Sequence, residues 1–363
     1  MNIIDVEVWP LHLPMAPHTP VTVGGETSAA HTLVRVMTDS GIHGCGEVFR
    51  LAPAGACALI EHELKPMLLG QDPRQIELLW DRMYRQSFRY GRAGIVLHAI
   101  SGIEVALWDI LGKASGLPVY QLLGGASRVR MPVYASMHKY AEPAHAAAVA
   151  VRCVELGYRA IKLHQRDVPS VAAVRAAIGP DIALMLDASG AWSPRVALRM
   201  AHELSPFNLE WLEEPLAAMD DYDGLRWLRD RSPVPIAAGE NEYTSAGFRE
   251  LISRRAVDVV QPDVIKAGGL SVCRKVAALA ESFDLDFSPH CFYYGPGIAA
   301  TLHLCLATPR ARYIEINPLD LEHEFMLPGM RPVDGYLAAP DAPGLGIDFD
   351  LPVLREHRRS FTC

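Results

Sequence analysis

The sequence predicts an α/β fold in which a closed barrel of alternating strands and helices follows a smaller α+β region. Its 363 residues are enough for two domains, or for one barrel with an appendage. Apolar residues make up 50% of the chain and charged residues 21%, as in globular proteins, so a disordered or fibrous protein is excluded. From about residue 129 onward, short apolar runs alternate with helical patterns.

The first 125 residues or so begin with strand patterns. Residues 2–9 and 31–38 are rich in β-branched side chains, and a turn signal follows at 39–41. We expect a small antiparallel sheet here. The stretch between the two strands, 14–30, is rich in proline and glycine, and a loop of this length is usually functional or mobile.

Helical patterns complete this N-terminal region. They cover residues 54–69, 73–89 and 93–115. The last pattern is apolar enough for a buried helix, and it stops at Gly116 and Pro118 as helices commonly do.

The next part of the chain contains eight apolar or β-branched runs separated by helical segments. Such alternation is typical of parallel strands with crossover helices, and eight runs predict a closed barrel. An open doubly wound sheet is the alternative, but the G-x-G-x-x-G signature after the first strand is missing. The runs are 130–135, 160–164, 182–187, 209–213, 236–239, 258–261, 286–290 and 312–315.

Three regions are therefore expected: an N-terminal α+β domain at 1–125, a barrel at 126–319 and a C-terminal segment at 320–363. The last is rich in proline, aspartate and glycine, and we expect it to pack back on the N-terminal domain.

Composition excludes several classes of partner. The net charge of −8 argues against a nucleic-acid or anionic-membrane surface. No apolar run of 18 residues predicts a membrane span, and the N-terminus does not resemble a signal peptide. Seven scattered cysteines without a C-x-x-C pair predict reduced thiols in the cytoplasm, not disulfides or a zinc site.

Polar residues stand where the predicted barrel strands end. A single acidic residue after a strand is usually a helix cap, but a series on successive strands converges on the carboxyl-terminal mouth of a barrel, where such proteins keep their chemistry. The series recurs at intervals of 23 to 27 residues and consists of Lys162 with His164, Asp187, Glu213, Glu240, Asp263, His290 and Glu315.

Three carboxylates on consecutive strands predict a metal site. Crowded together, Asp187, Glu213 and Glu240 would repel one another and raise each other's pKa. A hard divalent cation removes this cost and prefers oxygen ligands, and no nearby His or Cys triplet favours zinc. We therefore expect Mg²⁺.

Several motifs, taken together, resemble the mandelate racemase and muconate-lactonising branch of the enolase superfamily, over nearly the whole chain. The resemblance implies an α+β capping domain over a modified (β/α)₇β barrel, one Mg²⁺ held by Asp187, Glu213 and Glu240, and abstraction of a proton α to a carboxylate. The motifs are Gly44-Cys45-Gly46-Glu47, Ala106-Leu107-Trp108-Asp109, Gln121-Leu122-Leu123-Gly124-Gly125, Trp211-Leu212-Glu213-Glu214-Pro215, Gly239-Glu240-Asn241 and Gln261-Pro262-Asp263-Val264-Ile265-Lys266-Ala267-Gly268-Gly269.

The resemblance also implies an acid–base set. His290 and Asp263 resemble a His–Asp dyad, in which the carboxylate fixes the imidazole tautomer and raises its basicity. Lys162 would neutralise the substrate carboxylate. Glu315 resembles an acid that hydrogen-bonds to that carboxylate, for which it must be protonated in a dry site with a raised pKa.

Two positions depart from the family pattern. Much of the family has Lys-x-Lys where this chain has Lys162-Leu163-His164, so His164 is a second acid–base group, a hydrogen-bond donor to substrate, or a spacer. Ser189 stands where Asn is common. Weaker substrate-binding candidates are Lys266 after the sixth strand, Arg50 and, in the long N-terminal loop, His18.

The predicted reaction is the Mg²⁺-dependent dehydration of a sugar acid through an enediolate. Racemisation or epimerisation of a 2-hydroxy acid is the alternative, weakened by the missing second Lys. Other classes are a Schiff-base aldolase using Lys162, a zinc amidohydrolase, for which the first strand lacks His-x-His, and a non-catalytic binding protein. A small carboxylate is the expected partner, and a homo-oligomer the expected assembly.

Overall fold

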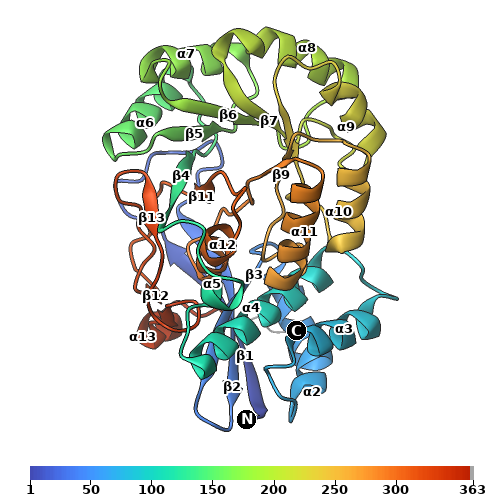
Figure 1. Cartoon of the computed structure of the whole chain (residues 1–363). Coiled ribbons are helices and arrows are strands. Elements are labelled where there is room, and N and C mark those ends of the chain that lie inside the picture. The colour runs from blue at the N-terminus through green and yellow to red at the C-terminus, as the bar shows by residue number, and fades with distance from the viewer. Residues whose placement is uncertain (360–363) are drawn as a thin grey trace.

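The structure, a computed structural model, describes residues 1–359. Its N-terminal part is built on a three-stranded antiparallel sheet in the order β1 (Ile3–Pro14), β2 (Ser28–Thr38) and β3 (His43–Val48). The long helix α4 (Ile95–Ser115) packs on this sheet, with the shorter helices beside it (Figure 1). The shorter helices are α1 (Pro53–Leu59), the π-helical turn Ile60–Leu64, α2 (Lys65–Leu68), α3 (Ile76–Ser87) and α5 (Val119–Leu122).

The glycines of the Gly44-Cys45-Gly46 motif allow β3 to lie directly against α4. A Cβ atom added at Gly44 would lie 2.0 Å from the carbonyl oxygen of Ala106, and one at Gly46 would lie 1.9 Å from that of Gly102. Any larger residue would push the helix off the sheet. This close contact explains why glycine alternates with other residues along β3.

Helix α4 is both long and strongly apolar. By length and composition it could cross a membrane, but 83% of its most apolar window is buried inside the protein, as in a core helix. Glu104, in its middle, is fully buried and accepts hydrogen bonds from the amides of Leu270 and Ser271 at the start of the barrel helix α11 (Leu270–Ser282). The helix therefore joins the N-terminal part to the barrel.

Eight parallel strands form the second part, in the order β10-β9-β8-β7-β6-β5-β4-β11. A parallel bridge between Phe287 and Ala311 connects β10 to the chain that enters β11, so the eight strands close. The strands are β4 (Arg130–Ser136), β5 (Ala160–Leu163), β6 (Ala183–Asp187), β7 (Leu209–Glu213), β8 (Ile236–Ala238), β9 (Val259–Val260), β10 (Asp286–Phe287) and β11 (Ile314–Ile316).

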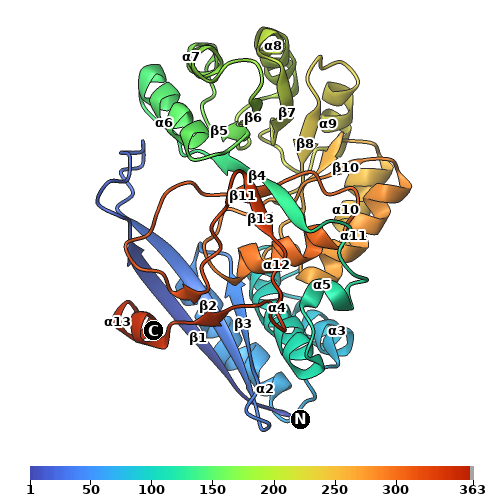
Figure 2. The same ribbon diagram turned by 60° about the vertical axis from the view of Figure 1, so that its left-hand side comes forward.

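Seven helices connect these strands and cover the outside of the barrel, which makes the fold (β/α)₇β as expected (Figures 1 and 2). The largest apolar cluster lies mainly between the strands and these helices, while a smaller one, with Trp211 and Tyr134, belongs to the barrel strands. The helices are α6 (Pro143–Glu155), α7 (Val168–Ile178), α8 (Pro194–Leu204), α9 (Tyr222–Arg229), α10 (Thr244–Ser253), α11 (Leu270–Ser282) and α12 (Pro296–Leu306).

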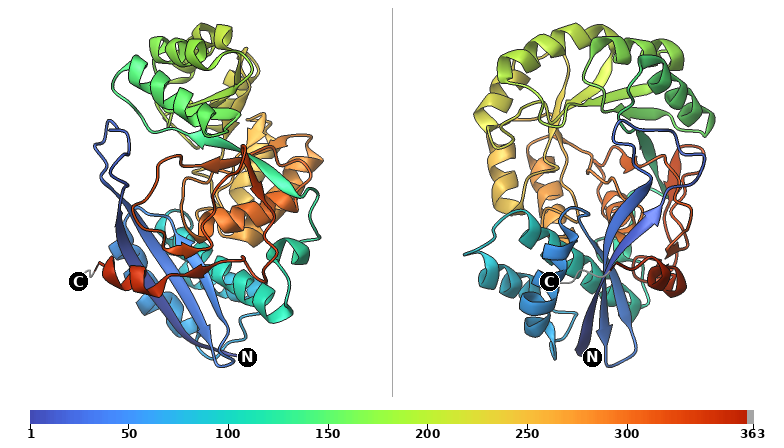
Figure 3. Two further views of the ribbon diagram at one scale, coloured as in Figure 1. Left: turned by 90° about the vertical axis from the view of Figure 1, so that its left-hand side faces the viewer. Right: turned by 180° about the vertical axis from the view of Figure 1, so that it is seen from behind.

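The segment after the barrel runs back along the molecule (Figure 3). It contacts β1 through bridges from Leu11 to Arg358 and from Met15, just past the strand, to Leu321. One of its strands, β13, also pairs antiparallel with β4 of the barrel. Its elements are β12 (Met326–Leu327), β13 (Tyr336–Ala338), β14 (Asp348–Phe349) and α13 (Leu351–Glu356).

One buried carboxylate joins three distant parts of the chain. Asp109 of α4 accepts hydrogen bonds from the amide of Cys45 on β3 at 2.9 Å and from the amide of Leu345, near β14, at 2.8 Å. Lys113, one turn along α4, pairs with the same carboxylate at 2.7 Å. No disulfide joins the cysteines within residues 1–359, and Cys363 lies outside the described residues.

The predicted N-terminal loop is shorter than expected because β1 continues to Pro14 and β2 begins at Ser28. The remaining loop reaches from the N-terminal sheet toward the barrel (Figure 2). The amide of Val23 donates to the carbonyl oxygen of Lys139, just after β4, at 2.8 Å. The loop is thus anchored to the barrel side of the molecule.

Candidate active site

The three predicted metal ligands lie together at the carboxyl ends of neighbouring strands. Asp187 and Glu213 are the last residues of β6 and β7 and are direct partners in the ladder between them. Glu240 follows β8. One oxygen from each carboxylate lies within 4.8 Å of the others, so the three can share one ion.

Polar neighbours orient these carboxylates. Trp211 and Gln261 donate to Glu213 Oε2 at 2.8 and 2.9 Å. Asn241 donates to Glu240 Oε1 at 2.9 Å. Such hydrogen bonds hold ligand oxygens in place before a metal arrives.

Ser189, where the family commonly has Asn, supports Asp187 in this chain. Its amide donates to Asp187 Oδ1 at 2.6 Å, and its hydroxyl lies 3.2 Å from the same oxygen. The replacement therefore keeps a hydrogen bond to the carboxylate.

The carboxylate cluster is electrostatically costly without a cation. Burial raises the pKa of Glu213, and burial together with the charge of Glu240 raises the pKa of the adjacent Glu214 to about 8. Burial acts in the same direction on Asp187, but the hydrogen bond from His164 and the charge of Lys162 hold the pKa of Asp187 well below its usual range. An all-oxygen set of this kind suits a hard divalent cation such as Mg²⁺.

Lys162 lies fully buried among the carboxylates. Its Nζ is 2.5 Å from Glu213 Oε1, 2.9 Å from Glu315 Oε1 and 3.9 Å from Asp187 Oδ2. Although burial alone would lower it, the charges of Glu213 and Glu315 hold the pKa of Lys162 well above its usual value. A Schiff-base lysine must be a neutral amine, so this geometry argues against an aldolase.

His290 and Asp263 form a hydrogen-bonded pair. His290 Nδ1 lies 2.6 Å from Asp263 Oδ2, and the hydroxyl of Tyr293 donates to the same oxygen. The other ring nitrogen, Nε2, lies 3.1 Å from Glu240 Oε2. Burial lowers the pKa of His290, but the charges of Glu240 and Glu315 and the contact with Asp263 raise it to about 9.

Glu315 is buried as expected, but it is a charged carboxylate where a protonated acid was expected. Both Lys162 and His290 lie near this fully buried carboxylate, and the amide of Cys291 donates to its Oε2 at 2.9 Å. Burial would raise its pKa, yet the charges of Lys162 and His290 lower it to about 2. The expectation of a protonated Glu315 with a raised pKa is therefore wrong for this arrangement of side chains.

His164 follows β5 and lies at the edge of the carboxylate cluster opposite to His290 in strand order. Its Nδ1 lies 2.6 Å from the carbonyl oxygen of Met137, and its Nε2 lies 3.1 Å from Asp187 Oδ2. Two imidazoles thus flank the carboxylates, one at the Asp187 side and one at the Glu240 side.

Of these groups, Asp187, Glu240 and the two imidazoles, His164 and His290, line a cavity of about 310 Å³. Lys266 and Arg50 line it. Lys266 is buried, contacts Asn241 Oδ1 at 2.8 Å and lies over the ring of Phe49. His18 is not part of this cavity: its side chain is 76% exposed and lies 3.5 Å from Asp320.

The structure adds cavity residues that the sequence reasoning missed. His138, two residues past β4, pairs with Glu26 of the N-terminal loop at 3.2 Å and contacts Asn317. Arg166 follows β5, and Tyr293 contacts the His290 dyad. The position of His138 just after the first strand is the same signal that identified the other strand-end residues, and it could have revealed this one.

Comparisons with known proteins agree with this architecture. Residues 3–124 match the family described as the mandelate racemase / muconate lactonizing enzyme N-terminal domain, and residues 145–353 match the enolase C-terminal domain-like family. D-galactarolactone cycloisomerase of Agrobacterium fabrum is 34% identical over 353 residues, which cover 91% of each chain. Arabinonate dehydratase of Saccharolobus solfataricus is 32% identical over 335 residues, 89% of each.

A solved structure connects this fold to a metal. A racemase from Streptomyces coelicolor A3(2), described with bound magnesium, has 30% identity and a TM-score of 0.89, and the match covers 98% of this chain and 100% of that one.

Proposed function

The chain belongs to the mandelate racemase and muconate lactonizing enzyme family of the enolase superfamily, and from this premise we propose that it dehydrates a sugar acid. The observation that carries the proposal is the position of His290. Its Nε2 faces the carboxylate cluster at 3.1 Å from Glu240, while its Nδ1 is held by Asp263 at 2.6 Å. From this position His290 Nε2 can reach a substrate whose carboxylate lies at the carboxylate cluster.

We propose Asp187, Glu213 and Glu240 as the ligands of one Mg²⁺. When bound, the ion supplies Lewis-acid stabilisation of the negative charge that builds on the substrate carboxylate during proton removal. The all-oxygen donor set and the buried, mutually repelling carboxylates support this assignment. Lys162, paired with Glu213 and Glu315, adds a fixed positive charge beside the same site.

In the proposed reaction, His290 in its neutral form takes the proton from the carbon α to the carboxylate. This form is favoured once a cation offsets the charge of Glu240 that raises the pKa of His290. The electron pair of the broken carbon–hydrogen bond forms a carbon–carbon double bond as the β-hydroxyl leaves, and His164 delivers the proton with which this hydroxyl leaves as water. The resulting enol tautomerises to a 2-keto-3-deoxy acid. Asp263 orients the ring of His290 and stabilises the imidazolium.

A second outcome is supported by His164. Racemisation or epimerisation needs an acid–base group on each face of the α carbon, and His164 stands across the carboxylates from His290. Lys162 cannot serve as this second group, because its ammonium is enclosed by carboxylates. We rank dehydration first because the relatives include an acid-sugar dehydratase.

The test is a product screen with purified protein and Mg²⁺ on a panel of aldonic and aldaric acids and their lactones. We expect a 2-keto-3-deoxy product from at least one acid, and we expect it to disappear in His290→Asn. The exposed His62→Asn is the matched control and should keep full activity. Epimerisation or cycloisomerisation without any keto product would overturn the proposal of dehydration.

We further infer that the enzyme works in the cytoplasm as a homo-oligomer. Light scattering on the purified protein tests the assembly, and a single-chain mass would refute it.

A further inference from the structure

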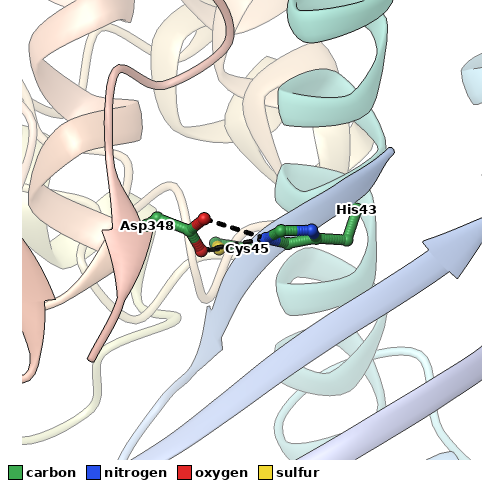
Figure 4. Close-up of side chains that lie close together, drawn as sticks. All are labelled: His43, Cys45 and Asp348. Atoms are coloured by element: carbon green, nitrogen blue, oxygen red, sulfur yellow. Dashed lines mark hydrogen bonds and ion pairs between the residues drawn. The ribbon is translucent and has the colours of Figure 1, made fainter. Parts of the chain in front are cut away.

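A second group of metal-ligating side chains lies outside the candidate active site, where the C-terminal segment meets the N-terminal sheet. It consists of His43 and Cys45 on β3 and Asp348 on β14 (Figure 4). His43 Nε2 lies 2.9 and 3.1 Å from the two carboxylate oxygens of Asp348, and Cys45 Sγ lies 3.6 Å from Oδ1. One ligand atom from each residue lies within 4.8 Å of the others.

Local structure explains why these side chains converge. Residues two apart on a strand project from the same face, so His43 and Cys45 point to the same side of β3. Asp348 is the first residue of β14, which the Asp109 carboxylate helps to place by accepting the amide of Leu345. The three side chains therefore come from two backbones that are already held in position.

We propose that His43, Cys45 and Asp348 bind a zinc-like divalent cation that joins the C-terminal segment to the N-terminal sheet. Sulfur, imidazole and carboxylate ligands at tetrahedral spacing are those that Zn²⁺ prefers, with ligand atoms roughly 3.3–3.7 Å apart. The sulfur–oxygen distance already has this value, and the nitrogen–oxygen distance is a few tenths of an ångström shorter. Water fills the fourth position, since the Asp348 side chain is 54% exposed.

The charges balance in such a site. One thiolate and one carboxylate neutralise a divalent cation, and the nearby Lys113–Asp109 pair is neutral by itself. Burial raises the pKa of the Cys45 thiol well above its usual value, so in the metal-free protein the proton stays on sulfur. A bound cation displaces this proton, and one proton is released for each ion taken up.

The sequence reasoning excluded zinc because the cysteines show no close spacing. That argument holds for sites built from one short segment. Here the carboxylate comes from the far end of the chain, about 300 residues from the two β3 ligands, so no local spacing reveals it.

The experiment uses the full chain in a Cys363→Ser background, which removes the thiol that lies outside the described residues. Chelator-stripped protein is saturated with Mg²⁺, to fill the carboxylate site, and then titrated with Co²⁺. We expect thiolate-to-cobalt charge-transfer absorption that saturates at about one equivalent. None of the three carboxylates of the candidate active site can produce this absorption.

Asp348→Asn is the deciding variant, because its side chain is half exposed and its loss should leave the fold intact. We expect it to weaken Co²⁺ affinity by more than about 100-fold, since it removes a direct ligand. Asp341→Asn, an exposed residue of the same segment, is the matched control and should bind as the background protein does. Cys45→Ala should abolish the absorption, and Cys153→Ala, also buried but on α6, should retain it.

A measurement of thermal stability tests metal binding independently of the charge-transfer absorption. Zn²⁺ should raise the Tm of the background protein in excess Mg²⁺, because a ligand of the folded state alone stabilises it. The rise should vanish in Asp348→Asn and persist in Asp341→Asn. Absence of the charge-transfer absorption, or equal Co²⁺ binding by Asp348→Asn and its control, would overturn the proposal.

Discussion

His164 and Met137 are joined by a 2.6 Å contact between the imidazole Nδ1 and the backbone carbonyl oxygen. A carbonyl oxygen can only accept, so Nδ1 carries the hydrogen and Nε2 is the nitrogen turned toward Asp187 at 3.1 Å. The Asp187 carboxylate also only accepts, so the ring that makes both contacts carries a hydrogen on each nitrogen. Burial lowers the pKa of His164, but the hydrogen bond to Asp187 and the charge of Asp187 raise it above its usual value. The other ring nitrogen, Nε2, faces the candidate active site.

The first prediction concerns this second imidazole. In His164→Gln, we expect water elimination to fall by ~10²-fold, because the donor on that side is lost. His290 remains, so exchange of the α hydrogen with solvent deuterium should continue. Deuterium uptake and keto-product formation, followed together by NMR, measure the two steps. Unchanged dehydration would assign both proton transfers to His290.

The second prediction concerns the dyad. His290→Asn should reduce both elimination and α-hydrogen exchange by about 10²–10⁴-fold, since it removes the base itself. Asp263→Asn leaves the base in place but loses its negatively charged partner, so a smaller loss in kcat is expected. His62→Asn serves as the control. Exchange at the normal rate in His290→Asn would assign the base to another residue.

A third prediction follows from the buried charge of Lys162. Removing it in Lys162→Met leaves Glu213 and Glu315 without their cation, and a broken buried pair destabilises a protein by ~3–5 kcal/mol. We expect this loss in urea unfolding with EDTA present. Excess Mg²⁺ should recover part of it, because the ion supplies positive charge to the same carboxylates. An equal loss with and without Mg²⁺ would contradict the proposed metal site.

The fourth prediction is a pH dependence of stability. Burial lowers the pKa of His303 on α12 to about 4, from 6.5. Between these values the unfolded chain binds more protons than the folded one, so stability is present above pH 6.5 and is lost as the pH falls toward 4. The full loss is ~3 kcal/mol. Urea unfolding from pH 4 to 7 should show a flatter dependence in His303→Gln than in His62→Asn.

The fifth prediction concerns the distal part of the cavity. Arg50 lines the cavity but is neither one of the carboxylates nor part of the His290–Asp263 pair, so Arg50→Ala should raise KM by ~10-fold with little change in kcat, as expected when uniform binding is lost. Arg152→Ala, an exposed arginine on the outer helix α6, is the control. A loss confined to kcat would instead give Arg50 a role in the chemical step.

Local patterns predicted the strand ends of the barrel well. An apolar run followed by one polar residue is a property of consecutive residues, and every strand-end residue from Lys162 to Glu315 lies where its run predicts. The family resemblance then indicated which of these residues are metal ligands and which are acid–base groups. The lengths of β1 and β2 were underestimated, because both strands continue through prolines and small residues that resemble a loop.

What could not be predicted depends on distances between remote side chains. The charge of Glu315 is set by Lys162, 2.9 Å away in space but on another strand. Exclusion of His18 from the cavity follows from the path of the N-terminal loop, which turns that side chain to solvent beside Asp320. The spacing of residues along the sequence determines neither the path of this loop nor the distance between Lys162 and Glu315.

The three-way junction at Asp109 has a consequence for synthesis. The sheet and α4 leave the ribosome early, but the amide of Leu345 that completes this junction is made 236 residues after Asp109. Until then a buried carboxylate lacks one of its partners, and β3 lacks the neighbour that carries Asp348. The N-terminal sheet and α4 therefore stay incomplete until the segment that carries Leu345 and Asp348 has been made, so docking of this segment is a late step of folding and truncation before Leu345 should be severe.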